Sequence, residues 1–227
     1  MKVDATPPEA ERNSAGPFSF SPDLTVLAEP TSARAEAIRG LRTHLLAQHV
    51  EEGRRGMSIC ATSADVRTIT VAANLAIAFA QVGVPCLLVD ADLRAPKLAD
   101  LIAPSVDLRG LGHYLVGEEG ADDIVQHDVL PNLSLVYSGG QHGNAQELLA
   151  SERFARIAKN WLRDYAVTIV NSPPANRYAD ARRISAVVGY SIVVARRNVT
   201  YVTDLKHLTS QLRGDGAKVV GTILSEE

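Results

Sequence analysis

One short stretch decides the fold: Leu87-Leu88-Val89-Asp90-Ala91-Asp92-Leu93-Arg94. Its first three residues are apolar, as in a strand buried on both faces of a sheet. In open α/β sheets, ligands bind outside the carboxyl ends of the strands. Asp90 and Asp92 are therefore candidates for a magnesium or phosphate site, with Arg94 to steady them. The same residues also fit a capped loop, in which a carboxylate accepts backbone N–H bonds at a turn.

Outward from this strand, apolar runs alternate with helical patterns along the chain. The predicted strands are 57–61, 86–89, 133–137, 167–170, 191–195 and 218–224. The predicted helices are 32–50, 70–82, 146–162, 177–187 and 203–212. Buried strands separated by helices predict an α/β fold: a single domain with a mainly parallel sheet and helices on both faces.

The N-terminal part of the chain differs from the rest in composition. Residues 1–30 contain five prolines and little sustained periodicity, which predicts a flexible N-terminal segment. Residues 31–227 are then enough for one domain with a substantial core.

Composition excludes several classes of function. With 23 basic and 26 acidic residues the net charge is −3, so no nucleic-acid partner is expected. The histidines do not fall at metal-binding spacings, and Cys60 and Cys86 lie in apolar runs typical of reduced core cysteines. The longest apolar stretch, 71–89, is interrupted by polar residues, glycine and proline. No direct membrane span and no secretory signal are predicted, so any membrane attachment is expected to come from a partner.

The stretch around Asp90 resembles the second Walker-type motif of the bacterial tyrosine kinases. These P-loop ATPases partner polysaccharide co-polymerases in capsule and exopolysaccharide synthesis. Residues 36–43 resemble the E-x-x-R-x-x-R helix through which those kinases form rings, and residues 71–76 resemble the helix after their phosphate loop. Residues 146–151 resemble a further segment of the family. These matches follow one another in the same order as in the family and span about 24–224. They imply a P-loop NTPase-like domain.

The phosphate loop departs from this family. A working loop is a glycine-rich turn ending in Gly-Lys-Ser/Thr, because backbone N–H groups, a lysine and a hydroxyl together hold the phosphates and magnesium. Residues 62–70 contain no glycine and no lysine. The resemblance implies that Thr68 stands at the lysine position and Ile69 at the magnesium-ligand position, with Thr70 the next residual position. Arg67 replaces the lysine only if the gap is moved, and Asp65 adds a charge that repels phosphates.

A second departure lies at the end of the strand predicted at 167–170. Where the family reads Val-Ile-Ile-Asp-Thr-Pro-Pro, residues 168–174 read Thr-Ile-Val-Asn-Ser-Pro-Pro. The resemblance implies that Asn171 has replaced an aspartate that holds magnesium through its water shell. A neutral amide is a poorer partner for a hard cation.

The sequence therefore predicts a degenerate member of the family without catalytic activity. We expect no catalytic residue, no metal and no cofactor, and an interaction or regulatory role in exopolysaccharide synthesis and export. Glu36, Arg39 and Arg42 are expected to contact a neighbouring subunit, because arginine pairs well with carboxylates. That subunit is a membrane polysaccharide co-polymerase, another copy of the chain or an active paralogue. The expected location is cytoplasmic, peripheral to the inner membrane through the partner.

Three alternatives remain open. The helix around Arg39 also fits solvated charge with weak i,i+3 pairing. The chain also fits a divergent tyrosine autokinase that uses ATP and Mg²⁺ through Asp90 and Asp92, with Arg67 as substitute cation. The third alternative is a deviant member of the cell-division and partitioning ATPases, which share this type of strand end. The E-x-x-R-x-x-R helix argues against that last reading.

Overall fold

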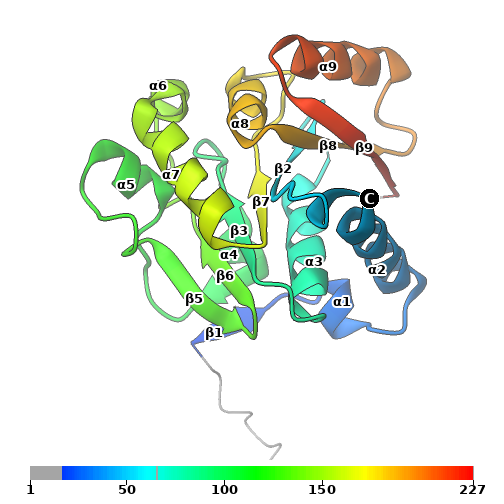
Figure 1. Ribbon diagram of the computed structural model, residues 1–227, viewed down its shortest axis with the longest axis horizontal. Helices are drawn as coiled ribbons and strands as arrows, with labels where there is room; N and C mark the ends of the chain where they lie inside the picture. The colour runs from blue at the N-terminus through cyan, green and yellow to red at the C-terminus, as the bar shows by residue number, and fades with distance from the viewer. Residues whose placement is uncertain (1–16, 65, 227) are drawn as a thin grey trace, which may run out of the picture.

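The computed structural model describes residues 17–64 and 66–226, and it shows a mainly parallel sheet between two layers of helices (Figure 1). The strands lie in the spatial order β5-β6-β3-β7-β2-β8-β9. Within this seven-stranded sheet of the described residues, β5 and β6 pair antiparallel and the other neighbouring strands pair parallel. The strands are β2 (Gly56–Ala61), β3 (Cys86–Asp90), β5 (Val125–Leu130), β6 (Leu133–Val136), β7 (Val167–Asn171), β8 (Tyr190–Arg196) and β9 (Lys218–Ser225). The predicted α/β class is confirmed.

Helices cover both faces of this sheet. One face carries α1 (Thr25–Ala28), α2 (Ala33–Leu45) with the π-helical turn η1 (Leu46–Val50), α3 (Thr68–Ala80) and α4 (Leu98–Leu101). The other carries α5 (Leu111–Val116), α6 (Ala145–Ala150), α7 (Glu152–Asp164), α8 (Asp180–Val188) and α9 (Val202–Gly214). Strand side chains alternate between the two cores: Leu88 points to the α3 side, and Leu87 and Val89 point to the α7 side.

Helix α3 is buried nearly all round, with ten of its thirteen residues inaccessible. A helix that is apolar on every side belongs in the interior of a protein. The sheet lies on one side of α3, and α1 and α2 lie on the other. This packing fixes the start of α3 beside the ends of the central strands.

The single helix predicted at 146–162 is wrong, because the chain breaks at Ser151. This residue has extended backbone angles, with φ −69° and ψ 155°. Its hydroxyl donates to the carbonyl of Leu148 (2.6 Å) and accepts the N–H of Phe154 (3.3 Å). One serine thus ends α6 and caps the start of α7.

The predicted flexible segment at 1–30 needs correction over its described part. Strand β1 (Phe18–Phe20) pairs antiparallel with β4 (Ile102–Pro104), and Leu24 and Val26 are fully buried. The ordered fold therefore begins before residue 31, because this segment supplies apolar side chains to the core. The rest of the predicted segment, 1–16, lies outside the described residues.

The side chain of Asn74, on α3, holds residues 23–26 in place. Its Oδ1 accepts hydrogen bonds from the Thr25 hydroxyl (3.2 Å) and the Val26 N–H (3.1 Å). Its Nδ2 donates to the carbonyl of Asp23 (3.1 Å). A buried amide that is fully bonded in this way specifies one position for the segment.

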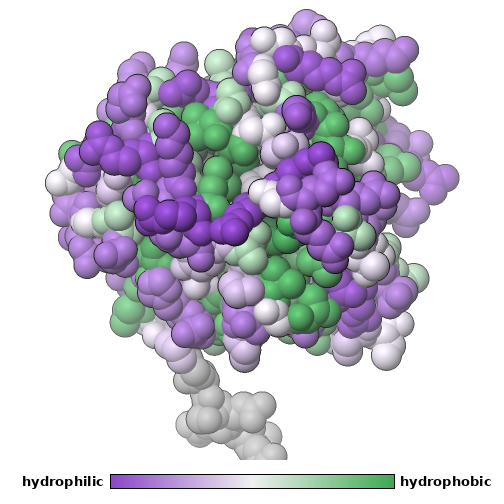
Figure 2. All heavy atoms as spheres, viewed as in Figure 1, coloured by the Kyte–Doolittle hydropathy of each residue, from purple (hydrophilic) through white to green (hydrophobic). Residues whose placement is uncertain are grey.

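The surface and the cysteines agree with the composition. On the face shown in Figure 2, hydrophilic residues divide the apolar surface into separate patches. Within 17–64 and 66–226, no helix has the length and apolar character needed to cross a bilayer. Cys60 and Cys86 are buried, unpaired core residues, as predicted.

Candidate functional site

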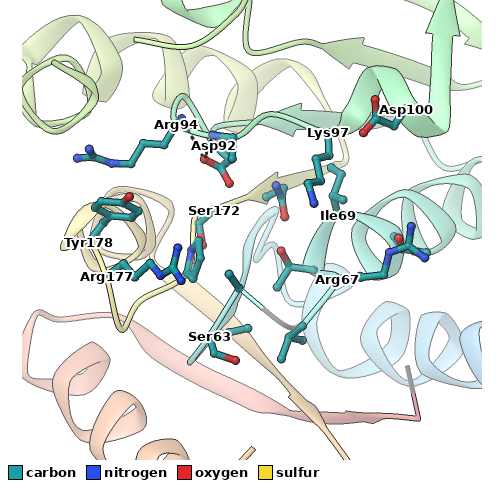
Figure 3. A pocket seen from close by; sticks show the side chains of 18 of the residues that line it. Ser63, Arg67, Ile69, Asp92, Arg94, Lys97, Asp100, Ser172, Arg177 and Tyr178 are labelled. Carbon is teal, nitrogen blue, oxygen red and sulfur yellow. Dashed lines mark hydrogen bonds between the residues drawn. The ribbon is translucent and has the colours of Figure 1, made fainter. Parts of the chain in front are cut away.

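A pocket of about 180 Å³ opens where the carboxyl ends of three central strands meet the start of α3 (Figure 3). Strand β7 pairs with both β2 and β3, so their ends lie side by side. Six of the predicted site positions line the pocket: Thr68, Ile69, Thr70, Asp92, Arg94 and Asn171. The topology therefore gathers residues that are up to about a hundred positions apart in the chain.

The loop that precedes α3 does not direct a cation into this pocket. Arg67 is the residue before the helix, and its guanidinium pairs with Asp23 Oδ2 at 3.1 Å. In Figure 3 its side chain extends away from the centre of the pocket. The suggested substitute for the lysine is thus engaged elsewhere. Asp65 lies outside the described residues.

The first turn of α3 offers little to a metal ion. Ile69 is only 6% exposed and packs in the core on the α3 side of the sheet. The position that the resemblance assigns to a magnesium ligand is therefore an apolar core residue. Thr70 Oγ1 is buried and has no hydrogen-bond partner among the described residues.

Asp90 serves the loop and does not line the pocket. It is fully buried, and its Oδ1 accepts from Asp92 N–H (3.2 Å) and from Asn171 Nδ2 (2.9 Å). Its Oδ2 accepts from the N–H groups of Lys97 and Leu98, each at 3.1 Å. Burial raises the pKa of Asp90, although these hydrogen bonds act in the opposite direction. For this residue the geometry is that of a capped loop.

Asp92 combines a turn with exposure to the pocket. Its Oδ1 accepts the N–H groups of Arg94 and Ala95, both at 3.0 Å. Its side chain is nearly buried, at 8% exposure, and points into the cavity in Figure 3. Asp92 thus places a hydrogen-bond acceptor on the wall of the pocket.

Arg94 links the loop after β3 to helix α8. Its Nε donates to Asp180 Oδ2 (2.6 Å) and its Nη2 to Asp180 Oδ1 (3.3 Å). The Asp180 side chain has no exposed surface, and the guanidinium lies 3.9 Å from the centre of the Tyr178 ring. A buried carboxylate needs such a bidentate partner, so the charge of Arg94 is already compensated.

Only one of the two polar side-chain atoms of Asn171 has a hydrogen-bond partner among the described residues. It is 3% exposed, and its Nδ2 donates to Asp90. Its Oδ1 is buried and finds no partner in the described part of the chain. An orphan buried acceptor costs about 1–3 kcal/mol, so this oxygen calls for a donor from water or a ligand.

Sequence reasoning missed two cations on the pocket wall. Lys97 comes from the loop after β3, and Arg177 comes from the loop between β7 and α8. Neither side chain forms an ion pair or hydrogen bond with a described residue. The available signal was that a proline marks each loop at a strand end, Pro96 or Pro174, with a cation one to three residues later.

The predicted partner-contact residues lie apart from the pocket, on α2. Arg39 Nη1 donates to the carbonyl of Pro30 (2.6 Å) and lies 3.5 Å from Glu36 Oε2. Arg42 Nη2 donates to the Thr43 hydroxyl (3.2 Å). The Glu36 side chain is 76% exposed. The contact between Arg39 and Glu36 matches the weak i,i+3 pairing considered above, and a role toward a partner stays a prediction.

Several known proteins resemble this chain in sequence. No family model matches the chain. It is 26% identical over 203 residues to a putative tyrosine-protein kinase, CapB, of Staphylococcus aureus, covering 89% of each protein. It is 29% identical over 197 residues to the tyrosine-protein kinase etk of Escherichia coli K12, covering 86% of this chain and 27% of that protein. The chain thus spans most of the first relative and about a quarter of the second.

Solved structures agree. The chimerical protein CapA2B2 superposes with a TM-score of 0.81 at 27% identity, over 90% of each chain. The kinase domain of the Escherichia coli tyrosine kinase ETK gives 0.83 at 27% identity, over 89% of this chain and 79% of that one. The septum site-determining protein MinD of Pyrococcus horikoshii, solved with Mg-ADP, gives 0.64 at 22% identity over 75% of this chain and 69% of that one, a likeness of fold alone.

Proposed function

The chain belongs to the family of the bacterial tyrosine-protein kinases, and on that premise we propose that it is a non-catalytic member, a pseudokinase. It acts by binding other proteins of an exopolysaccharide synthesis and export system. The single observation that carries this proposal is the construction of the pocket. The groups that would hold a triphosphate and its magnesium are replaced, or are engaged within the protein.

The pocket does not fit ATP and Mg²⁺. Ile69 packs in the core where the resemblance implies a hydroxyl ligand, and Asp90 accepts four hydrogen bonds from the protein itself. Asn171 is neutral, and Arg67 pairs with Asp23 instead of reaching inward. Stabilisation of the transferred phosphoryl depends on these groups, and each tenfold in rate corresponds to about 1.4 kcal/mol. We therefore derive no phosphoryl-transfer step for this chain.

The alternative, a divergent autokinase, has less support. It requires Asp90, Asp92 and Arg67 to act on one ligand. Asp90 does not line the pocket, and Arg67 lines it but pairs with Asp23. Of the three, only Asp92 both lines the pocket and points into it.

The partners and the cellular location proposed for this chain rest on its membership of the family. Relatives of this chain include a protein described as a putative tyrosine-protein kinase in the cps region of Klebsiella pneumoniae. We propose that a membrane polysaccharide co-polymerase, a second copy or an active paralogue binds at Glu36, Arg39 and Arg42. The chain then lies in the cytoplasm, held at the inner membrane by that partner.

The test is nucleotide binding by the intact chain. We expect isothermal titration with ATP and Mg²⁺ to give no measurable heat of binding, because the loop lacks the donors that wrap a triphosphate. A coupled assay should likewise detect no ATP hydrolysis. The kinase domain of Escherichia coli ETK, measured in parallel, provides the positive control. Micromolar affinity or turnover by this chain would contradict the proposal.

A further inference from the structure

Strand β9 forms one edge of the seven-stranded sheet (Figure 1). It pairs with β8 on one side, and no strand of the described residues lies along its other side. An open edge presents unpaired N–H and C=O groups, which can pair with a strand from another chain. The outer side of β9 is therefore a surface where a further strand can be added.

The direction of the backbone identifies the residues that offer these groups. The ladder between β8 and β9 is regular over 221–225. The Arg197 N–H donates to the Ser225 carbonyl at 2.8 Å, so Ser225 faces β8. Backbone groups of successive residues in a strand point to alternate sides, so Thr222 and Leu224 turn theirs outward. Each of these two residues can exchange a pair of hydrogen bonds with an added antiparallel strand.

The two large side chains of this stretch are apolar and only partly covered. Leu224 is 66% exposed, although it lies within a strand. Ile223 pairs with Val194 of the core, and it lines a groove of about 490 Å³ between α2 and the end of β9. Ile38 and Leu41 of α2 line the same groove. An added strand would thus pair its backbone with β9 and bury apolar side chains, the two contributions on which strand addition depends.

This edge is complementary to a second copy of itself. In an antiparallel pair centred on Ile223, that residue meets its equivalent at a two-fold axis, and Thr222 of each copy lies opposite Leu224 of the other. Lys218 begins β9 and Glu226 follows its end. The same arrangement therefore brings each lysine diagonally toward the glutamate of the other copy. A parallel pair would instead set like charges side by side.

We propose that two copies of the chain associate through β9, in an isologous antiparallel pair that joins their sheets into one. Thr222 and Leu224 supply the interchain hydrogen bonds, and the two Ile223 side chains pack together beside the groove. The ion pair of Glu226 with Arg197 is exposed and 3.4 Å long, so exchanging it for a contact with the other copy costs little. This surface is distinct from the charged residues of α2, and the inference does not rest on the proposed function.

The strength of the dimer follows from the length of the paired stretch. The register of β9 shifts before residue 221, which leaves Val220 as the extra residue of a bulge. Regular pairing is thus limited to the last part of the strand, and a small interface is typical of weak complexes. We expect a concentration-dependent dimer with a dissociation constant in the micromolar range.

Sedimentation of the full chain over a range of concentrations tests the pairing. We expect Thr222→Lys to weaken dimerisation about tenfold, because a lysine from each copy then lies near the axis. Leu224→Glu should weaken it by a similar factor for the same reason. Thr203→Lys, on the exposed side of α9, is the matched control and should leave it unchanged. Urea unfolding of each variant checks that the fold is retained.

The two substitutions combined in one chain test the register. With Thr222→Lys and Leu224→Glu together, each lysine lies opposite a glutamate of the other copy, so dimerisation should return to at least the wild-type level. A loss of fold or a general effect of charge would not be reversed in this way. A double variant that dimerises no better than the single ones would overturn the inference.

A cysteine at the axis gives an independent readout. Residues of a non-hydrogen-bonded antiparallel pair have Cα atoms about 4.5 Å apart, which a disulfide can span. Mild oxidation of Ile223→Cys should therefore yield a covalent dimer, whereas Val106→Cys, an exposed apolar position elsewhere, should not. The natural cysteines, Cys60 and Cys86, are buried and do not compete.

Three results would overturn the inference. One is a chain that sediments as a monomer at every concentration, and another is an equal effect of Thr222→Lys and Thr203→Lys. The third is self-association that Arg42→Glu abolishes and Thr222→Lys leaves intact, because the contact would then lie on α2. None of these results bears on nucleotide binding, so the pseudokinase proposal stands or falls separately.

Discussion

At position 90, a carboxylate at a strand end holds the backbone of the loop that follows it. Its two oxygens accept four hydrogen bonds, including those from the N–H groups of Lys97 and Leu98. The same carboxylate therefore positions the loop that brings Lys97 to the pocket. An acidic residue at this position thus has a structural role in the loop.

Replacing Asp90 by asparagine should destabilise the fold by about 1–3 kcal/mol, the cost of an unsatisfied buried polar group. Both carboxylate oxygens of Asp90 accept hydrogen bonds. Asparagine replaces one of these oxygens with an NH₂ group, which is a donor and would face the donors that now bind the carboxylate. Urea unfolding of the Asp90→Asn variant at neutral pH measures the change. Asp122→Asn, an exposed acid, is the matched control and should change stability by less than about 0.5 kcal/mol.

The raised pKa of Asp90 predicts a pH dependence of this effect. A carboxyl whose pKa is higher in the folded state than its ordinary 3.8 holds its proton more tightly when folded. Its contribution to stability is therefore largest below that ordinary value and is lost as the pH rises toward the folded pKa. We expect the stability of wild type relative to Asp90→Asn to be greater at pH 4 than at pH 7. An opposite slope would show that the hydrogen bonds outweigh burial.

At the scale of elements, Asn74 couples α3 to the segment that precedes α2. Three of its hydrogen bonds reach residues about fifty positions earlier in the chain. The helix that starts at the pocket is thereby held against α1 and the residue before Leu24 as well as against the sheet. A strand and helix of only three and four residues persist because these bonds and buried Leu24 hold them.

The Asn74→Ala variant should therefore lose about 2–4 kcal/mol of stability, since it leaves several buried backbone and hydroxyl groups without partners. Hydrogen exchange of the amides of residues 18–28 should accelerate more than that of β3. Asn160→Ala, at a partly exposed position of α7, provides the control. Uniform acceleration across both regions would mean that Asn74 stabilises the fold globally and not this segment in particular.

Prediction from sequence succeeded where an element is encoded within itself. Strands β3, β7 and β8 consist mostly of apolar residues, and α3 is a long, mainly apolar stretch of residues that favour helix, so their positions follow from the local pattern. The break at Ser151 could not be predicted in this way, because serine is tolerated inside helices and its capping bonds form only in the folded chain.

The residues of the candidate site could likewise be predicted from the sequence only in part. The ends of the central strands pointed to Asp92 and Asn171, since ligands bind at that edge of a parallel sheet. Lys97 and Arg177 lie in loops whose course depends on tertiary contacts, such as the bonds from Asp90 to the Lys97 backbone. Pro96 and Pro174 mark these two loops in the sequence, but no local pattern shows that the cations after them line a pocket.

At the scale of the whole molecule, α2 presents its charged side chains away from the pocket. The contacts of Arg39 with Glu36 and of Arg42 with Thr43 are exposed and contribute little to stability, so breaking them to bind a partner would cost little. The proposed partner surface on α2 and the pocket are therefore separate and can be altered independently.

A charge reversal at Arg42 tests the proposed partner surface on α2. We expect Arg42→Glu to weaken self-association, or association with the co-polymerase, by about tenfold or more, because a like charge replaces an attractive one at the interface. Analytical ultracentrifugation of the chain alone and with the partner's cytoplasmic segment measures this. Arg156→Glu, on the exposed side of α7, should have no effect. Equal behaviour of the two variants would remove α2 from the interface.

The contact between Asp90 and Asn171 also limits which residues position 171 can hold. The amide nitrogen of Asn171 lies 2.9 Å from Asp90 Oδ1, so an aspartate at 171 would place a second buried carboxylate beside the first. Two acids at that distance resist joint ionisation. The neutral amide at 171 thus lets a buried carboxylate stay at 90 without a second negative charge beside it.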